Sequence, residues 1–138
     1  VEHDQKFFSL LVNKYVDIVF ANEEEAKSFT GKEAREALDV IAEMCSVAVV
    51  KMGARGALVR KGTEVVVVDA CTVPHVVDTT GAGDYFAAGF LFGLTSGYSL
   101  ERCAKIGTLV SGEVIQVIGT TLPGKVWNAI KRKLELNN

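Results

Sequence analysis

Apolar positions recur along this chain with two different spacings, and together they predict helices that alternate with short buried strands. Apolar residues three or four positions apart, as in residues 7–15, are typical of one face of an amphipathic helix. Runs of consecutive, largely β-branched apolar residues, such as residues 47–50, are typical of strands covered on both faces in a parallel sheet. We expect helices at residues 4–14, 22–30, 32–45, 85–94, 100–117 and 125–136, and strands at residues 16–21, 47–51, 57–60, 64–68 and 72–77.

These elements and their short connections predict one α/β domain, with a mainly parallel sheet flanked by helices. Lys61 and Gly62 are a turn signal between two of the strands and add a small β-hairpin. Right-handed crossovers bring the carboxyl ends of parallel strands to one edge of the sheet, where ligands bind. We therefore expect Asn22, Gly53 and residues 78–84, each of which follows a predicted strand, to come close together.

Composition and charge exclude several functional classes. The 138 residues are 49% hydrophobic and 23% charged, and a net charge of −2 gives no electrostatic basis for binding nucleic acid or an anionic membrane. The longest apolar run, residues 85–94, is too short to span a bilayer. Cys45, Cys71 and Cys103 lie far apart and outside any CxxC spacing, so we expect neither a zinc site nor a disulfide framework. Buried thiols in the reducing cytoplasm are the predicted state.

The strongest chemical signal is the segment Asp-Thr-Thr-Gly-Ala-Gly-Asp at residues 78–84. It precedes an apolar helix, whose first backbone N–H groups have no partner within the helix and carry partial positive charge. Gly81 and Gly83 lack a Cβ, so the backbone there can approach an anion closely. Asp84 is either a first-turn acid that stabilises its own helix or a base beside the anion. A second acid at Asp78 and the two hydroxyls after it favour the functional interpretation.

Residues 78–91 resemble the C-terminal signature of the ribokinase-like (PfkB) carbohydrate and nucleoside kinases, with no departure from its pattern. The resemblance implies a three-layer, Rossmann-like α/β fold and ATP-dependent phosphorylation of a hydroxyl on a sugar or nucleoside, with ATP and Mg²⁺ as cofactors. It also implies that Asp84 takes the proton from the acceptor hydroxyl. The backbone N–H groups of Gly81, Ala82 and Gly83 would form the anion hole for the transferred phosphoryl group.

Two earlier segments resemble further motifs of the same family. Asn22 and Glu25 on their own form an N-cap followed by first-turn acids. The resemblance instead implies that Glu25 helps to organise Mg²⁺ and that Asn22 lies near the nucleotide phosphates. The segment Lys51-x-Gly53-x-x-Gly56 resembles the nucleotide loop of the family and lacks the GK[ST] ending of a Walker A loop. A plain glycine-rich turn explains its pattern equally well.

Asp78 and Thr80 align with positions that, in some members of the family, hold a monovalent cation such as K⁺ beneath the anion hole. The alternative is that Asp78 accepts hydrogen bonds from backbone N–H groups of its own turn, and both interpretations stay open. In the first interpretation the loop around Gly119 completes the cation site. We expect His75 to be a partly buried structural residue and Trp127 to belong to the core.

Members of this family are longer, and their N-terminal part supplies acceptor-binding strands and a lid. We therefore expect residues 1–138 to be a C-terminal nucleotide-binding and catalytic portion in which the N-terminal half and the lid are absent. Residues 15–26, 81–93 and 119–123 look most like the adenosine-kinase-like branch, whereas residues 78–81 are shared with many sugar kinases.

The expected partner is a small-molecule sugar or nucleoside acceptor of unspecified identity, and a homodimer is left open. The alternative function is a nucleotide-binding module without catalytic activity, because the acceptor-recognition residues are expected in the absent half. A dinucleotide-binding domain is disfavoured, since no acidic residue ends a following strand about 20 positions after the glycine turn.

Overall fold

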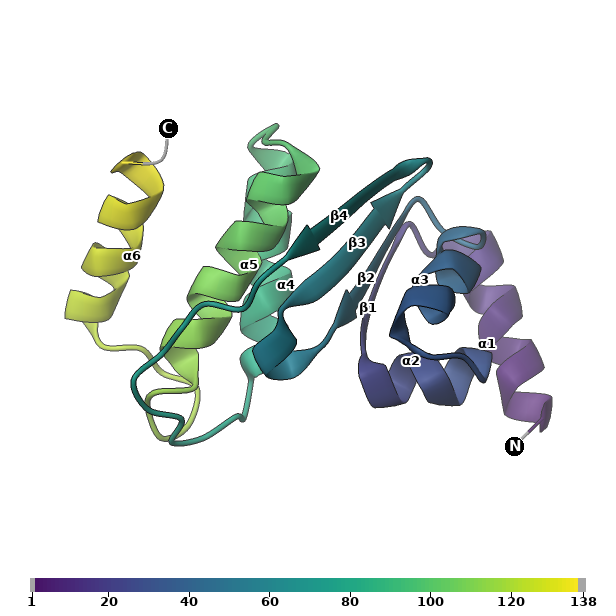
Figure 1. The fold of residues 1–138 in the computed structure, drawn as a ribbon, viewed down its shortest axis with the longest axis horizontal. Coiled ribbons are helices and arrows are strands. Elements are labelled where there is room, and N and C mark those ends of the chain that lie inside the picture. The colour runs from purple at the N-terminus through teal and green to yellow at the C-terminus, as the bar shows by residue number, and fades with distance from the viewer. Residues whose placement is uncertain (1, 137–138) are drawn as a thin grey trace. The chain divides into compact units, whose positions relative to one another are not determined.

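The computed structural model describes residues 2–136, which form two compact units, one up to Val67 and one from Val68 (Figure 1). The first unit contains α1 (Glu2–Tyr15), β1 (Ile18–Asn22), α2 (Glu23–Thr30), α3 (Ala34–Ala42), β2 (Val47–Lys51), a 3₁₀ turn (Gly53–Arg55), β3 (Ala57–Lys61) and most of β4 (Glu64–Val68). The second unit contains α4 (Ala82–Thr95), α5 (Leu100–Val114) and α6 (Gly124–Leu136).

The sheet has the strand order β1-β2-β3-β4. β1 and β2 are parallel, with Ile18 opposite Val47 and Asn22 opposite Lys51, whereas β2 and β3 are antiparallel. The expectation of a mainly parallel sheet is therefore corrected to a mixed sheet in the described residues. The physical reason is the length of the connections: α2 and α3 fill a crossover between β1 and β2, while the connections after β2 and β3 are too short for one.

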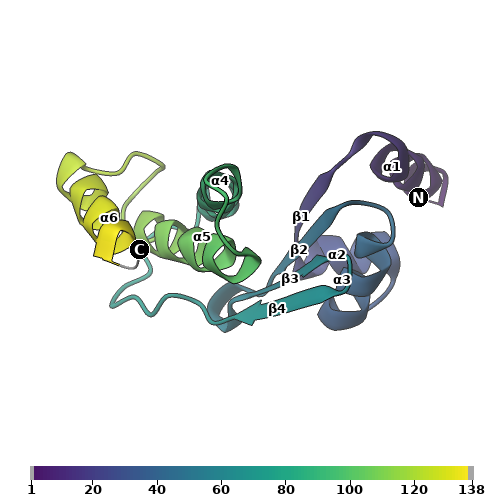
Figure 2. The ribbon, with the colours of Figure 1, turned by 90° about the horizontal axis from the view of Figure 1, so that it is seen from above.

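Helices α2 and α3 cover this sheet, with α2 against β1 and α3 against β2 and β3 (Figures 1 and 2). The side chains of Ala37, Leu38 and Ile41 on α3 are buried, as their helical spacing predicts. They pack with Ala48, Val50 and other apolar residues of the strands in one core cluster. This core fixes the crossover and hence the positions of the carboxyl ends of β1 and β2.

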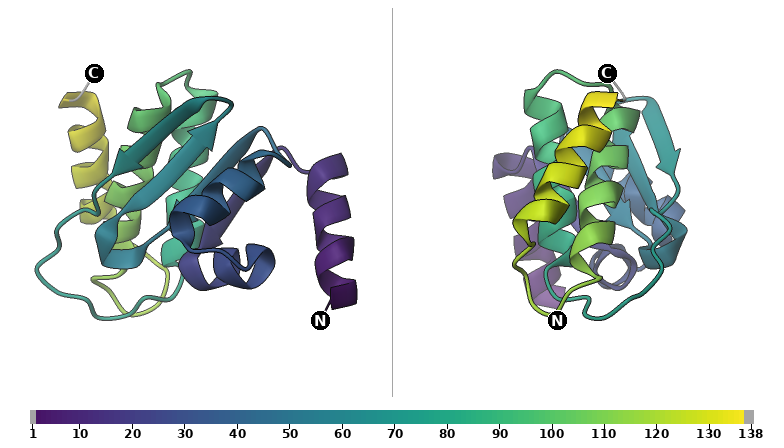
Figure 3. Two further views of the ribbon diagram at one scale, coloured as in Figure 1. Left: turned by 45° about the vertical axis from the view of Figure 1, so that its right-hand side comes forward. Right: turned by 90° about the vertical axis from the view of Figure 1, so that its left-hand side faces the viewer.

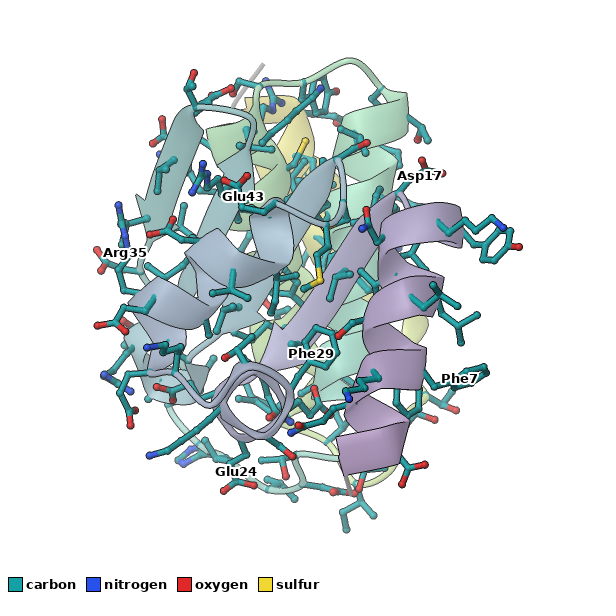
Figure 4. All side chains as sticks on the ribbon, turned by 90° about the vertical axis from the view of Figure 1, so that its right-hand side faces the viewer. Phe7, Asp17, Glu24, Phe29, Arg35 and Glu43 are labelled. Atoms are coloured by element: carbon teal, nitrogen blue, oxygen red, sulfur yellow. The ribbon has the colours of Figure 1, made fainter. Side chains whose placement is uncertain are left out.

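Helix α1 leaves large apolar side chains exposed. Its link to α2 includes a hydrogen bond of 2.8 Å from Gln5 Nε2 to the Ser28 carbonyl oxygen. Phe29 of α2 packs against the core cluster, whereas Phe7 of α1 points away from it (Figure 4). Phe8 and Leu10 are also more than half exposed, so the amphipathic pattern of this helix is not matched by burial within the described chain.

The second unit is built around the contact of α4 with α5, which lie side by side with α6 next to α5 (Figure 3). Gly89 and Gly93 of α4 and Gly107 of α5 permit this close approach. A Cβ placed on Gly89 would lie 2.6 Å from Val110 Cγ2 and 2.9 Å from the Ile106 carbonyl oxygen. The predicted helix after the glycine turn is confirmed and extends over Ala82–Thr95. Its expected burial is corrected to one face, because Leu91 and Phe92 on the other face are exposed.

One predicted strand is wrong. Residues 72–77 form no strand in the described structure, and Val76 and Val77 are more than half exposed. Pro74 has no N–H to donate to a ladder. The N–H groups of Val77 and Asp78 donate instead to the carbonyl oxygen of Ile115 just after α5, at 2.7 and 3.2 Å. The β-branched composition of this run therefore reflects an irregular segment held to the end of a helix.

Most other predicted boundaries agree with the structure. Residues 47–51 and 64–68 are strands over their whole predicted length, and the latter follow a turn at Gly62, which has φ +58. Ser99 caps α5 by accepting a hydrogen bond of 3.3 Å from the Arg102 N–H. That helix ends at Val114 rather than at residue 117, and α3 covers only Ala34–Ala42 of the predicted residues 32–45.

We predict that Gly89→Ala lowers the stability of the chain by about 1–3 kcal/mol, because the added methyl group overpacks the α4–α5 contact. The measurement is the midpoint of thermal or denaturant unfolding. Gly124→Ala is the matched control, since a Cβ at that position meets no atom within 4 Å. Equal effects of the two substitutions would contradict the assigned role of Gly89.

Candidate active site

The turn at residues 78–84 leads directly into α4 in the second unit. Gly81 is the N-cap residue and has φ +78, a left-handed conformation that favours glycine. The Ala82 N–H donates to the Thr79 carbonyl oxygen at 3.2 Å, and the Tyr85 N–H donates to the Gly81 carbonyl oxygen at 2.9 Å. Among the described residues, the N–H groups of Gly81, Gly83 and Asp84 have no acceptor.

This pattern defines what the turn offers to an anion. These free N–H groups at the start of a 14-residue helix combine local donors with the positive end of the helix dipole. Of the three predicted donors, only the Ala82 N–H already has a partner, at the long end of the hydrogen-bond range. Its use by a ligand requires that the Thr79 carbonyl oxygen be displaced.

The Asp84 side chain is exposed and has no hydrogen bond or ion pair with any described residue. It lies at a cleft of about 520 Å³ between α4, α5 and α6, which is lined mainly by apolar side chains such as Phe92, Ile106 and Trp127. The carboxylate is therefore accessible to a ligand and is not engaged elsewhere. This accessibility is what a base in the first turn requires.

Asp78 joins the glycine turn to a distant loop. Its Oδ1 accepts a hydrogen bond of 2.9 Å from the Thr80 N–H, and its Oδ2 accepts one of 2.9 Å from the Gly119 N–H. Hydrogen bonds from the Thr80 side chain, and then from the Thr80 and Gly119 N–H groups, hold the pKa of Asp78 below its usual range. The carboxylate is thus ionised at neutral pH, and the backbone-bonding interpretation is the one observed. A monovalent cation at Asp78 and Thr80 stays a prediction.

Sequence reasoning missed the part that Tyr85 plays beside this turn. Its hydroxyl donates to the Thr120 carbonyl oxygen at 2.6 Å, and its ring stacks on Trp127 with centroids 6.1 Å apart. A phenol directly after Asp84 was the available signal for the Tyr85 contact.

Two predictions about side-chain burial in this unit are wrong. Trp127 was assigned to the core but is 38% exposed, because its ring covers Tyr85 beside the open cleft. His75 is exposed rather than partly buried, since it lies in the irregular segment at residues 72–77.

The first unit brings together the other set of predicted residues. Asn22 and Glu25 form a capping box, in which the Glu25 N–H donates to Asn22 Oδ1 and the Asn22 N–H donates to Glu25 Oε2, both at 2.8 Å. Asn22 pairs in register with Lys51, so the carboxyl ends of β1 and β2 are adjacent as predicted. Gly31 ends this helix in a left-handed conformation, with φ +70.

The predicted nucleotide loop of the first unit is a tight turn. Gly53 and Gly56 have φ +56 and +90, and the Met52 N–H donates to the Gly56 carbonyl oxygen at 2.8 Å. An ion pair between Arg55 and Glu23 ties this turn to the start of α2. The positive φ angles favour glycine at both positions, as the turn interpretation expects. Nucleotide binding by this loop stays a prediction.

The Glu25 carboxylate of the first unit fits a hydrated metal ion better than a direct metal centre. Within residues 2–136 no group of three or more His, Cys, Asp or Glu side chains is arranged to hold a metal ion. Glu25 is exposed, and its Oε1 atom is free of the capping box. Mg²⁺ commonly keeps several waters and uses one or two carboxylates together with substrate phosphates, so an exposed Glu25 fits that mode. Both Asp78 oxygens already accept N–H groups.

The described helices include none with the length and apolar character needed to cross a membrane.

A family model described as "pfkB family carbohydrate kinase" matches residues 5–127 of the chain. A sugar kinase of Archaeoglobus fulgidus, itself uncharacterized, is 36% identical over 107 residues, which are 77% of this chain and 42% of the relative. The crystal structure of adenosine kinase from Sinorhizobium meliloti is 43% identical with a TM-score of 0.88, over 96% of this chain and 41% of that one. Fructokinase from Vibrio cholerae, in a form with fructose, ADP and calcium bound, is 28% identical with a TM-score of 0.78, over 94% and 45% of the two chains.

These similarities agree with the glycine turn before α4 and with the mixed α/β architecture, and together they define a ribokinase-like α/β protein. The chain belongs to the pfkB family of carbohydrate kinases. The ribokinase-like α/β fold and the family membership expected from residues 78–91 are thereby confirmed. The similarity to an adenosine kinase agrees with the adenosine-kinase-like branch. The chain spans about two fifths of the length of the curated relatives that it matches.

We predict that Asn22→Ala destabilises the first unit by about 0.5–2 kcal/mol, because α2 loses its N-cap acceptor. The measurement is the free energy of unfolding from denaturant titration. Asn13→Ala is the matched control, since Asn13 is an exposed residue of α1 with no side-chain hydrogen bond to the described chain. A loss in the control as large as that in Asn22→Ala would rule out the capping box as the cause.

Proposed function

We propose that the protein contributes to ATP-dependent phosphorylation of a hydroxyl group on a sugar or nucleoside, with Asp84 as the general base. The observation that carries this proposal is the exposed, unpartnered Asp84 carboxylate directly beside the free N–H groups of Gly83 and Asp84. A base and an anion-binding turn within one helical turn of each other are the two groups that phosphoryl transfer to an alcohol requires.

In the proposed reaction the acceptor oxygen attacks the terminal phosphorus of ATP while its proton passes to the Asp84 carboxylate. The bond from the phosphorus to the bridging oxygen breaks, and ADP leaves with that oxygen. The N–H groups at Gly81, Gly83 and Asp84 and the positive end of α4 stabilise negative charge on the equatorial phosphoryl oxygens. The Ala82 N–H joins them only if its bond to Thr79 opens.

Residues of the first unit are proposed as further nucleotide-binding groups. Asn22 and Lys51 stand at adjacent strand ends, and Gly53 and Gly56 keep the neighbouring turn free of side chains at two points. Mg²⁺, which Glu25 would hold through water, supplies neutralisation of the phosphate charge when it is bound. Thr80 and Asp78 remain the candidate residues for a monovalent cation such as K⁺.

The acceptor is proposed as a small sugar or a nucleoside, since the relatives include kinases of both kinds. A nucleotide-binding module without turnover is the second candidate, and the specific observation that favours it is the coverage of only about two fifths of the relatives' length. ATP binding and transfer of labelled phosphate to a panel of nucleosides and sugars, measured on one sample, separate the two. A homodimer and a cytoplasmic location stay predictions.

We predict that Asp84→Asn lowers turnover by about 10²- to 10⁴-fold while the dissociation constant of ATP changes little, because only the proton acceptor is lost. The measurement is phosphate transfer beside ATP binding by calorimetry. Asp69→Asn is the matched control, as Asp69 is another exposed acid of the same unit with no side-chain hydrogen bond to the described chain. Normal turnover in Asp84→Asn would refute the role of the base.

We predict that Glu25→Gln raises the Mg²⁺ concentration needed for half-maximal ATP binding, because the amide keeps an oxygen acceptor for the Asn22 N–H and loses the charge. ATP binding is titrated with Mg²⁺, and again with a chelator present, where the variant and the parent chain should agree. Glu24→Gln, in the same helical turn, is the control for the charge near the helix start. An identical Mg²⁺ midpoint in both variants would remove Glu25 from the metal site.

A further inference from the structure

We propose that Tyr85 is a positioning residue, which fixes the anion-binding turn by holding the loop of residues 118–121 against it. The inference rests on the proposed function, since it concerns the same phosphate site. It concerns a side chain that sits next to the base and does not itself touch the reacting atoms. The evidence is a set of contacts between the turn at residues 78–85 and the 118–121 loop.

The 118–121 loop is hydrogen-bonded to residues at both ends of the turn. Before the turn, Asp78 Oδ2 accepts the hydrogen bond of 2.9 Å from the Gly119 N–H. After the turn, the Tyr85 hydroxyl donates the bond of 2.6 Å to the Thr120 carbonyl oxygen. Two consecutive loop residues are thus held by two side chains that flank the anion-binding segment. We call this pair of hydrogen bonds the clasp.

A third contact lies between the two bonds of the clasp. A Cβ built on Gly81 would come within 2.7 Å of Thr120 Cγ2, so the loop presses directly on the backbone of the turn. Displacement of Thr120 therefore changes the space around Gly81. Gly81 is the N-cap residue of α4 and lies just before the residues that carry the other free N–H groups. The loop and the turn are therefore in direct contact at this point.

The loop has little else to hold it. Within the described residues, the hydrogen bonds of residues 118–121 to the rest of the chain are the two of the clasp. Ile118 is 85% exposed, and Thr120 and Thr121 are also exposed. Loops with few buried contacts and few hydrogen bonds open easily, so loss of one of the two bonds has a large local effect.

The ring of Tyr85 is held independently of its hydroxyl. It stacks on Trp127 of α6, with an angle of 23° between the rings, and Ala82 and Tyr85 pack beside the core of Val110, Val114 and Ile130. The substitution Tyr85→Phe therefore keeps the packing and removes only the hydrogen-bond donor. This makes it a clean probe of the clasp.

The expected consequence is specific to the terminal phosphate of the nucleotide. A loosened turn must be ordered when a phosphate binds, so ATP binding weakens, by about 2- to 10-fold for the loss of one hydrogen bond. AMP lacks the phosphate that this turn would bind, and its affinity should not change. A general loss of structure would weaken both nucleotides alike.

The test compares the parent chain with Tyr85→Phe and with Tyr15→Phe, an exposed tyrosine of α1 with no hydroxyl hydrogen bond to the described chain. Amide hydrogen exchange at Thr80 and Gly119, followed by NMR without ligand, reports on the clasp itself. Dissociation constants of Mg·ATP and of AMP report on the phosphate site. We expect faster exchange and weaker ATP binding in Tyr85→Phe alone, with AMP binding unchanged.

The proposal is overturned by unchanged exchange in Tyr85→Phe, by faster exchange with unchanged ATP affinity, or by equal weakening of ATP and AMP. If the parent chain binds no ATP, the proposed function fails on that result. The exchange data then test the positioning role separately. Equal exchange at Thr80 and Gly119 in Tyr85→Phe and in the parent chain, measured without nucleotide, overturns that role.

Discussion

The carboxylate of Asp78 is the constraint on which the candidate site of the second unit depends. It bridges backbone N–H groups that belong to residues 80 and 119, one on each side of the α4–α5 hairpin in sequence. A single short side chain thereby sets the entry of the chain into α4 and the exit from α5 toward α6. An ionised acceptor is suited to this task, because hydrogen bonds to charged groups are stronger than those between neutral ones.

The two helix starts that carry the predicted chemistry are electrostatically different. Helix α2 begins with three acids, Glu23, Glu24 and Glu25, of which one completes the capping box and another pairs with Arg55. Helix α4 begins with two glycines around an alanine and has one acid in its first turn. The start of α4 is therefore open to an anion, whereas the start of α2 is filled by its own carboxylates and suits a cation near phosphate.

Local chemistry allowed much of the fold to be predicted from the sequence. The caps at Asn22, Gly31 and Ser99 depend only on neighbouring residues, so their patterns identify them directly. The run at residues 72–77 misled because β-branched composition does not say whether a partner strand exists, and here the backbone bonds to Ile115. The glycine turn and its acids were predictable as a motif.

The contacts of Tyr85 and Trp127 were not predictable in the same way, because they join residues 35 or more positions apart. Helical spacing placed Trp127 on an apolar face but could not show that this face borders a cleft. Likewise, the pattern of residues 78–84 identified glycine donors without showing that the Ala82 N–H bonds to Thr79. Pairings between distant segments have no periodic signature along the chain.

The geometry of Gly81 has a consequence for how this sequence can vary. Gly53, Gly62 and Gly119 also have positive φ, yet a Cβ at each of them would meet no atom within 4 Å, so a replacement there faces backbone strain alone. Gly81 faces that strain and a collision with Thr120 at once. Gly81 therefore tolerates the fewest substitutions of these four glycines. A larger residue at position 81 would require a smaller side chain at position 120.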